Sequence, residues 1–136
     1  MLKRFSISLE DKLLTIFDEH IRAHSYNNRS EAIRDLIRKA FVKEEWQADK
    51  PVMGVISLVY DHHQHKLQEK VTLVQHDYHH HIVSTTHVHM DHHNCLEVIV
   101  VRGKAKEVQE LADRLAALKG VRDANLAMSS TGKTLH

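Results

Sequence analysis

The first 45 residues contain one short strand pattern that has nothing to pair with inside its own segment. Apolar and polar side chains alternate from Arg4 to Leu9, a period of two that predicts a strand with one apolar face. So short a segment cannot bury an adequate hydrophobic core alone. Both problems are resolved if two copies pair their strands into an antiparallel ribbon and interlock the helices that follow. The sequence therefore predicts an obligate dimer.

Two helical patterns follow this strand. Apolar residues recur at helical spacing from Leu13 to Ile21 and again from Ile33 to Ala40. Asn28 stands three residues before Glu31, the spacing of a capping box at a helix start. The only proline, Pro51, lies just past the second pattern, where prolines commonly follow a helix. We therefore expect one domain over residues 1–45, a linker over residues 46–51 and a second domain over residues 52–136.

The second domain reads as strand, helix, strand, strand, helix, strand. The predicted strands and helices, in order, are Met53–Tyr60, Leu67–Tyr78, His81–Met90, Leu96–Val101, Lys104–Lys119 and Val121–Met128. Two βαβ halves joined by a hairpin predict a ferredoxin-like βαββαβ sheet with both helices on one face. The fold class of the whole chain is therefore α+β.

Two histidines and the only cysteine converge at one end of the predicted hairpin. His87 and His89 are two residues apart in a strand, so their side chains point to one face of the sheet. The polar stretch 90–94 turns the chain and brings Cys95 back to the start of the next strand. Two imidazoles and a thiolate form a nitrogen and sulfur site for a transition metal. We expect the histidines on the helix-free face, at a contact between subunits.

Composition excludes several classes of protein. A single cysteine rules out an internal disulfide and is typical of a reducing compartment. No apolar run approaches the roughly 18 residues that span a bilayer, and the N-terminus has no signal-peptide core. We therefore expect a cytoplasmic protein without a membrane partner. The net charge of +1 is too small to indicate nucleic acid by itself.

The first 45 residues resemble the ribbon-helix-helix repressors, in which a two-stranded ribbon enters the major groove of DNA. The resemblance covers the strand pattern, both helices and the stretch Asn27–Arg34. The alternative is that the polar side of the strand is simply the solvated face of an edge strand. The resemblance implies base contacts by Arg4, Ser6 and Ser8, and a phosphate seat at a helix start made by Asn28, Arg29 and Ser30.

With a ferredoxin-like, ACT-type domain that carries His-x-His-x5-Cys, the chain resembles the nickel-responsive transcriptional regulators over most of its length. The resemblance implies a planar Ni²⁺ site made of His87, His89 and Cys95 from one subunit and His76 from a neighbouring subunit. His79 is a rival for the fourth place. The resemblance also implies a dimer of dimers that binds a palindromic operator in double-stranded DNA and represses nickel uptake genes in response to nickel.

Other interpretations of the metal motif remain open at this point. The same ligands suit copper, zinc or cobalt, so the chain could sense another divalent ion, or the metal could only stabilise the fold. A zinc enzyme with three protein ligands is a further alternative. We find no HExxH motif, phosphate-binding glycine loop or Ser/His/Asp set, and predict that the chain is not an enzyme. A ribbon-helix-helix antitoxin would not need the second domain.

Glu31 and Asp35 could hold a cation, although a solvated helix face explains this pair more simply. Most of the other histidines are expected to be surface residues or weak secondary metal sites.

Overall fold

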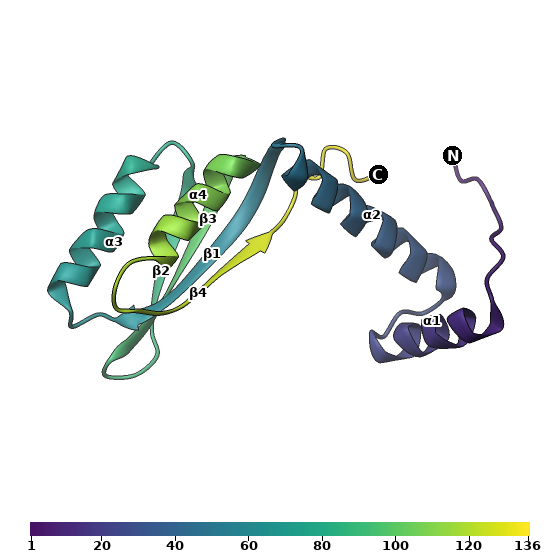
Figure 1. Cartoon of the computed structure of the whole chain (residues 1–136), viewed down its shortest axis with the longest axis horizontal. Coiled ribbons are helices and arrows are strands. Elements are labelled where there is room, and N and C mark those ends of the chain that lie inside the picture. The colour runs from purple at the N-terminus through teal and green to yellow at the C-terminus, as the bar shows by residue number, and fades with distance from the viewer. The chain divides into compact units, whose positions relative to one another are not determined.

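A computed structural model describes all 136 residues and divides them into two compact units, Met1–Ala40 and Phe41–His136 (Figure 1). The first unit holds α1 (Asp11–Ala23) and the first part of α2 (Arg29–Gln47). The second unit holds the end of α2 followed by β1 (Pro51–Asp61), α3 (His65–Asp77), β2 (Ile82–His89), β3 (Asn94–Lys104), α4 (Ala105–Ala116) and β4 (Val121–Met128).

Helix α2 begins with the predicted cap. The Asn28 side-chain oxygen accepts a hydrogen bond from the backbone N–H of Glu31 at 2.9 Å. The Glu31 carboxylate in turn accepts the backbone N–H of Asn27 at 3.1 Å. These bonds satisfy backbone donors that have no partner inside the helix. The cap predicted from Asn28 and Glu31 is confirmed.

The predicted strand over Arg4–Leu9 does not form in the single chain. Residues 1–10 adopt neither helix nor strand. The reason is physical: a strand needs a neighbouring strand for its backbone groups, and the sequence places that neighbour in a second copy. Apolar side chains of this unit are correspondingly uncovered, with Phe5 71% and Ile16 61% exposed. A single copy of the first unit is therefore an incomplete folding unit.

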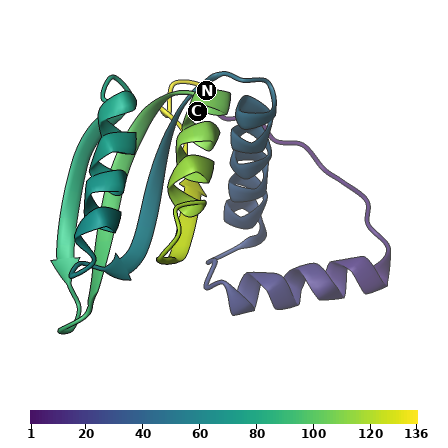
Figure 2. The same cartoon turned by 60° about the vertical axis from the view of Figure 1, so that its left-hand side comes forward.

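The second unit has the predicted ferredoxin-like sheet. Its four strands lie in the order β2-β3-β1-β4, and every neighbouring pair is antiparallel. Helices α3 and α4 cover the same face of the sheet (Figures 1 and 2). The longest pairing, between β1 and β3, runs from Pro51 opposite Lys104 to Asp61 opposite Asn94. The predicted α+β fold class is confirmed.

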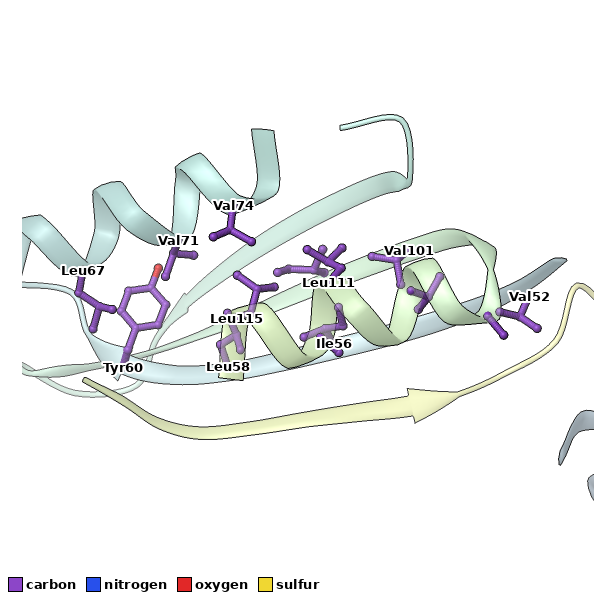
Figure 3. Close-up of a cluster of buried hydrophobic side chains, with 14 of the residues drawn as sticks. Val52, Ile56, Leu58, Tyr60, Leu67, Val71, Val74, Val101, Leu111 and Leu115 are labelled. Carbon is purple, nitrogen blue, oxygen red and sulfur yellow. The ribbon is translucent and has the colours of Figure 1, made fainter. Parts of the chain in front are cut away.

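The core of the second unit lies between the sheet and its two helices. Alternate residues of β1 point toward the helices, as Ile56, Leu58 and Tyr60 do in Figure 3. Leu111 of α4 and Val71 of α3 pack on them from above. A fully buried aliphatic side chain of this size contributes roughly 1.5–3 kcal/mol to stability. Burial of the apolar face of the strand against the apolar faces of the two helices therefore stabilises this unit.

The end of α2 packs into the second unit. Trp46 belongs to the core cluster, and its indole N–H donates a hydrogen bond to the carbonyl of Ser129 at 2.8 Å. The hydroxyls of Ser130 and Thr134 donate to the carboxylate of Glu45. Residue 46, where the sequence predicts the start of a linker, is thus a helical residue of the core. The C-terminal segment after β4 holds this helix end in place.

Trp46→Ala should destabilise the second unit by about 3–5 kcal/mol, because the substitution leaves a cavity at the edge of the core. Trp46→Phe keeps most of the apolar surface and loses only the bond to Ser129, so its cost should be about 1 kcal/mol. Urea unfolding at one fixed subunit concentration measures both. Wild-type stability of Trp46→Ala would show that the end of α2 does not contribute to this core.

Candidate functional site

The pairing of β2 with β3 places the predicted metal ligands in two cross-strand pairs. The two pairs are neighbours on the same face of the sheet, and each pair is called a row below. His89 is directly opposite Cys95, and Cys95 is opposite Tyr60 on the other side. One row further on, His87 is opposite Glu97. Directly opposite residues of an antiparallel pair project from the same face of the sheet. The strand register therefore brings His87, His89 and Cys95 to one end of one face.

This face is the one covered by helices, so the expected helix-free placement of His87 and His89 is wrong. The Thr85 hydroxyl, on the same side of β2, donates to the side-chain oxygen of Gln75 in α3 at 3.2 Å. Gln75 also donates to the carboxylate of Glu97, whose neighbour in the row is His87. The alternation of side chains along a strand shows which residues share a face, but it does not show which face the helices cover. Both faces of β3 are largely apolar, so the sequence does not determine which of them lies under the helices.

A buried charged residue, Glu97, lies beside the ligands, and the sequence did not single it out. Only 1% of Glu97 is exposed. Its oxygens accept hydrogen bonds from the Tyr60 hydroxyl at 2.8 Å and from the Gln75 amide, and Nε2 of His87 lies 3.0 Å away. Burial, followed by the hydrogen bond to Glu97, raises the pKa of Tyr60, so this hydroxyl remains a neutral donor. With Nε2 of His87 directed at Glu97, Nδ1 is the nitrogen left for a metal.

The thiol of Cys95 is buried beside these groups. Burial raises the pKa of Cys95, a hydrogen bond with Tyr60 acts in the opposite direction, and the negative charges of Glu97 and Asp61 raise it further. A buried thiol of this kind becomes a thiolate when a bound cation supplies the compensating charge. The position of Cys95, opposite a histidine and shielded from water, suits a metal ligand.

His62 offers another possible ligand nitrogen beside His89. Nδ1 of His62 is buried and has no hydrogen-bond partner. The His62 ring stands edge-on to the ring of His89, with 4.8 Å between their centroids. Burial is the main cause that lowers the pKa of His62, which favours the neutral form of its ring. Imidazole nitrogens beside a thiol are donors that nickel and other borderline metals accept. The residues present therefore fit a transition metal.

His76 lies apart from this group. It is an exposed residue of α3, nine residues after Leu67, whose side chain packs in the core. At 3.6 residues per turn, nine residues place His76 about 180° around the helix from Leu67. The structure thus brings His87, His89 and Cys95 together and leaves His76 on the outer face of α3.

One other group of metal-binding side chains is assembled at this end of the sheet. Asp61, His63 and His93 each offer a ligand atom, and these atoms all lie within 4.8 Å of one another. From the sequence, the two histidines are expected to be surface residues or weak secondary metal sites. The signal that could have identified them is a tripeptide that occurs twice, Asp-His-His at 61–63 and at 91–93.

The predicted DNA contacts lie on the first unit. Arg4, Ser6 and Ser8 are exposed in the N-terminal segment, and Ser30 is exposed at the start of α2. Arg29 donates two hydrogen bonds to Asp18, at 3.0 and 2.9 Å. In the first turn of α2 the Asn28 side chain takes the N–H of Glu31, and the N-terminus of a helix favours an anion.

The two carboxylates considered for a cation have partners within this unit. Glu31 completes the cap of α2, as described above. Asp35 accepts a hydrogen bond from the Tyr26 hydroxyl and lies 3.1 Å from the ammonium of Lys39. The Tyr26 bond is the main cause that lowers the pKa of Asp35. Packing of the turn and helix therefore accounts for both acidic residues.

Comparison with known proteins assigns both halves of the chain. Residues 53–129 match the NikR C terminal nickel binding domain, and residues 3–44 match the ribbon-helix-helix protein, copG family. The chain belongs to the family of nickel-responsive regulators.

The chain is 76% identical to a Desulfotalea psychrophila protein over the whole of both chains. It is 52% identical to one from Geobacter metallireducens over 98% of this chain and 96% of that protein. A Thermococcus kodakarensis protein is 50% identical over 97% of this chain and 96% of its own length. All three carry the description "Putative nickel-responsive regulator".

A solved structure of an uncharacterised Thermotoga maritima protein is similar in fold alone. The TM-score is 0.52 at 14% identity, over 57% of this chain and 96% of that one. None of the helices of this chain is long and apolar enough to cross a membrane.

Membership of the family decides between the functions left open by the sequence. A nickel-responsive regulator binds DNA, and its ribbon-helix-helix half binds as a dimer. The expected cofactor, nickel, and the prediction that the chain is not an enzyme are both confirmed. The alternative of a zinc enzyme with three protein ligands is overturned.

Glu97→Ala should destabilise the second unit by roughly 1–3 kcal/mol, because the buried Tyr60 hydroxyl loses its acceptor. The same substitution frees the ring of His87 and should weaken nickel binding by about 10–100-fold. Glu110→Ala, at an exposed carboxylate of α4, is the matched control and should change neither quantity. Unfolding in urea and a nickel titration measure the two effects. Unchanged nickel affinity in Glu97→Ala would mean that Glu97 does not orient a ligand.

Proposed function

We propose that this chain is a repressor of nickel uptake genes that acts as a dimer of dimers. In this proposal Ni²⁺ is held by His87, His89 and Cys95 of one chain and by His76 of a neighbouring chain, and nickel binding raises the affinity for a palindromic operator. The observation that carries the proposal is the row in which His89 stands opposite the buried Cys95. Because the function is exerted on the chromosome, we assign it to the cytoplasm.

The donor set supports nickel as the effector. Three imidazoles and one thiolate give a d⁸ ion the strong ligand field that favours a square plane, which zinc gains nothing from. When bound, Ni²⁺ supplies coordination bonds that join two chains. Around it Glu97 orients His87, and Tyr60 lies in the row of Cys95. These partners hold the ligands in place before any metal arrives.

The position of His76 supports a ligand shared between chains. The side chains of His87 and Cys95 lie on the face that α3 covers, whereas His76 is directed away from that face. His76 cannot turn inward without unpacking α3, whose buried residues include Val71 and Val74. A neighbouring chain that packs against this end can present its own His76 without that cost. The same contact would join two DNA-binding dimers into a tetramer.

The DNA contacts divide by chemistry. An arginine can bond bidentately to guanine O6 and N7, and short hydroxyls donate to or accept from several bases, which suits Arg4, Ser6 and Ser8 for base contacts. The first turn of α2, with Asn28, Arg29 and Ser30, suits a phosphate. Arg29 is already paired with Asp18, so the guanidinium is held at the helix start and carries less net charge there.

Nickel should produce an intense near-ultraviolet band, from charge transfer between the Cys95 thiolate and a planar d⁸ ion. Cys95→Ala should abolish this band and the nickel-dependent gain in operator affinity, and His80→Ala, at an exposed histidine, should keep both. His76→Ala and His87→Ala should each lose the band, and refolding the two together should restore part of it. Mixed tetramers contain some contacts in which an intact His76 faces an intact His87.

Absorbance and binding to DNA selected from random sequence measure these outcomes. A band that persists in Cys95→Ala would show that the assigned sulfur is wrong. No recovery of the band after proven mixing of subunits would place all four ligands in one chain. Equal nickel affinity with and without operator would refute the coupling, because linkage requires each ligand to tighten the other by the same factor.

Arg4→Ala should lose roughly 1–3 kcal/mol of operator binding and relax the base preference at its contact. Arg29→Ala should instead weaken binding to all sequences alike and flatten the salt dependence by about one unit. Binding isotherms on operator and random duplexes at several salt concentrations separate the two effects. Equal losses on both duplexes for Arg4→Ala would move this residue to the phosphate contacts.

A further inference from the structure

Two copies of the tripeptide Asp-His-His lie side by side at one end of the sheet. The first, residues 61–63, begins at the last residue of β1, and the second, residues 91–93, directly precedes β3. The β1–β3 pairing ends with Asp61 opposite Asn94. Because His93 directly precedes Asn94, the sheet register itself brings the two tripeptides together.

Each tripeptide folds into the same turn. Oδ1 of Asp61 accepts the backbone N–H of His63 at 2.9 Å, and Oδ1 of Asp91 accepts the backbone N–H of His93 at 2.8 Å. In both, an aspartate holds the second histidine after it, a local bond that fixes the backbone. The Asp91 carboxylate also accepts hydrogen bonds from Asn94, so both of its oxygens have partners within the turn. The Asp61 carboxylate has a free oxygen.

The two turns bring three ligand atoms together. Nδ1 of His63 lies 3.3 Å from Oδ1 of Asp61, and the rings of His63 and His93 have centroids 5.9 Å apart. One ligand atom from each of Asp61, His63 and His93 lies within 4.8 Å of the others, a spacing that a single ion can bridge after small side-chain movements. Two imidazoles and one carboxylate are ligands that divalent first-row metals accept.

We propose that Asp61, His63 and His93 form a second site for a divalent transition metal, with Zn²⁺ as its simplest occupant. The site contains no sulfur and is open to solvent at both histidines, so it is weaker than a site that includes Cys95 and leaves coordination positions for water. It uses none of His87, His89 and Cys95, and Asp61 directs its side chain to the sheet face opposite that of Tyr60 and Cys95, because successive residues of a strand point to opposite faces. The proposal does not depend on the nickel function.

The test uses the full-length chain with Cys95→Ala, which removes the thiolate of the proposed nickel site. Zn²⁺ titrated into this protein by calorimetry should still occupy one site per chain. Adding His63→Gln or His93→Gln should weaken this binding by about tenfold or more, since even an outer-shell partner of a metal ligand is worth 10–100-fold. Asp61→Asn, which retains an oxygen to accept the His63 N–H, should weaken it as well.

His80→Gln in the same background is the matched control and should leave Zn²⁺ affinity unchanged, since His80 is an exposed histidine outside the two tripeptides. Circular dichroism verifies that each variant is folded. Wild-type Zn²⁺ affinity in both His63→Gln and His93→Gln would overturn the proposal. An equal loss in His80→Gln would also overturn it, by showing diffuse binding to surface histidines. Failure of the nickel function would appear separately, as absence of the charge-transfer band in the wild-type chain.

Discussion

The carboxylate of Glu97 is the group on which the arrangement of the metal-binding end depends. A buried charge is costly unless hydrogen bonds compensate it, and Glu97 receives these from Tyr60 on β1 and Gln75 on α3, with His87 of β2 beside it. Any movement of α3 away from the sheet would leave this charge without one of its donors. Glu97, on β3, therefore adds polar contacts to β1, α3 and β2 directly beside the candidate ligands.

The pairing of β1 with β3 decides which side chains can act together. With Tyr60 opposite Cys95 and Asp61 opposite Asn94, one register builds the buried row that contains the thiol and also joins the two Asp-His-His turns. A shift of one residue would turn Cys95 toward the uncovered face and separate the turns. The alternating burial of β1, with every second residue from Val52 to Tyr60 under the helices, opposes such a shift because it would expose the core.

Periodicity in the sequence was sufficient for the helices and strands of the second unit, because each buries one apolar face whose spacing can be counted. Three features could not be obtained in this way. The strand from Arg4 to Leu9 needs a second copy, which a single chain does not supply. The face occupied by His87 depends on where α3 packs, and β3 is apolar on both faces. Trp46 is predicted from the sequence to begin a linker, because its hydrogen-bond partner Ser129 is distant in the sequence.

The single chain is incomplete at each place where it is expected to act. Phe5 and Ile7 lie exposed at the strand that needs a partner, and His76 is directed away from the other three candidate ligands. A ligand that binds only an assembled form stabilises that assembly by mass action. Under the proposed function, a metal held by two chains would therefore act on the contact between chains, and its effect on DNA would come through that contact. Helix α2 is suited to carry such an effect, because it starts at the candidate phosphate seat and ends with Trp46 in the core of the metal-binding unit.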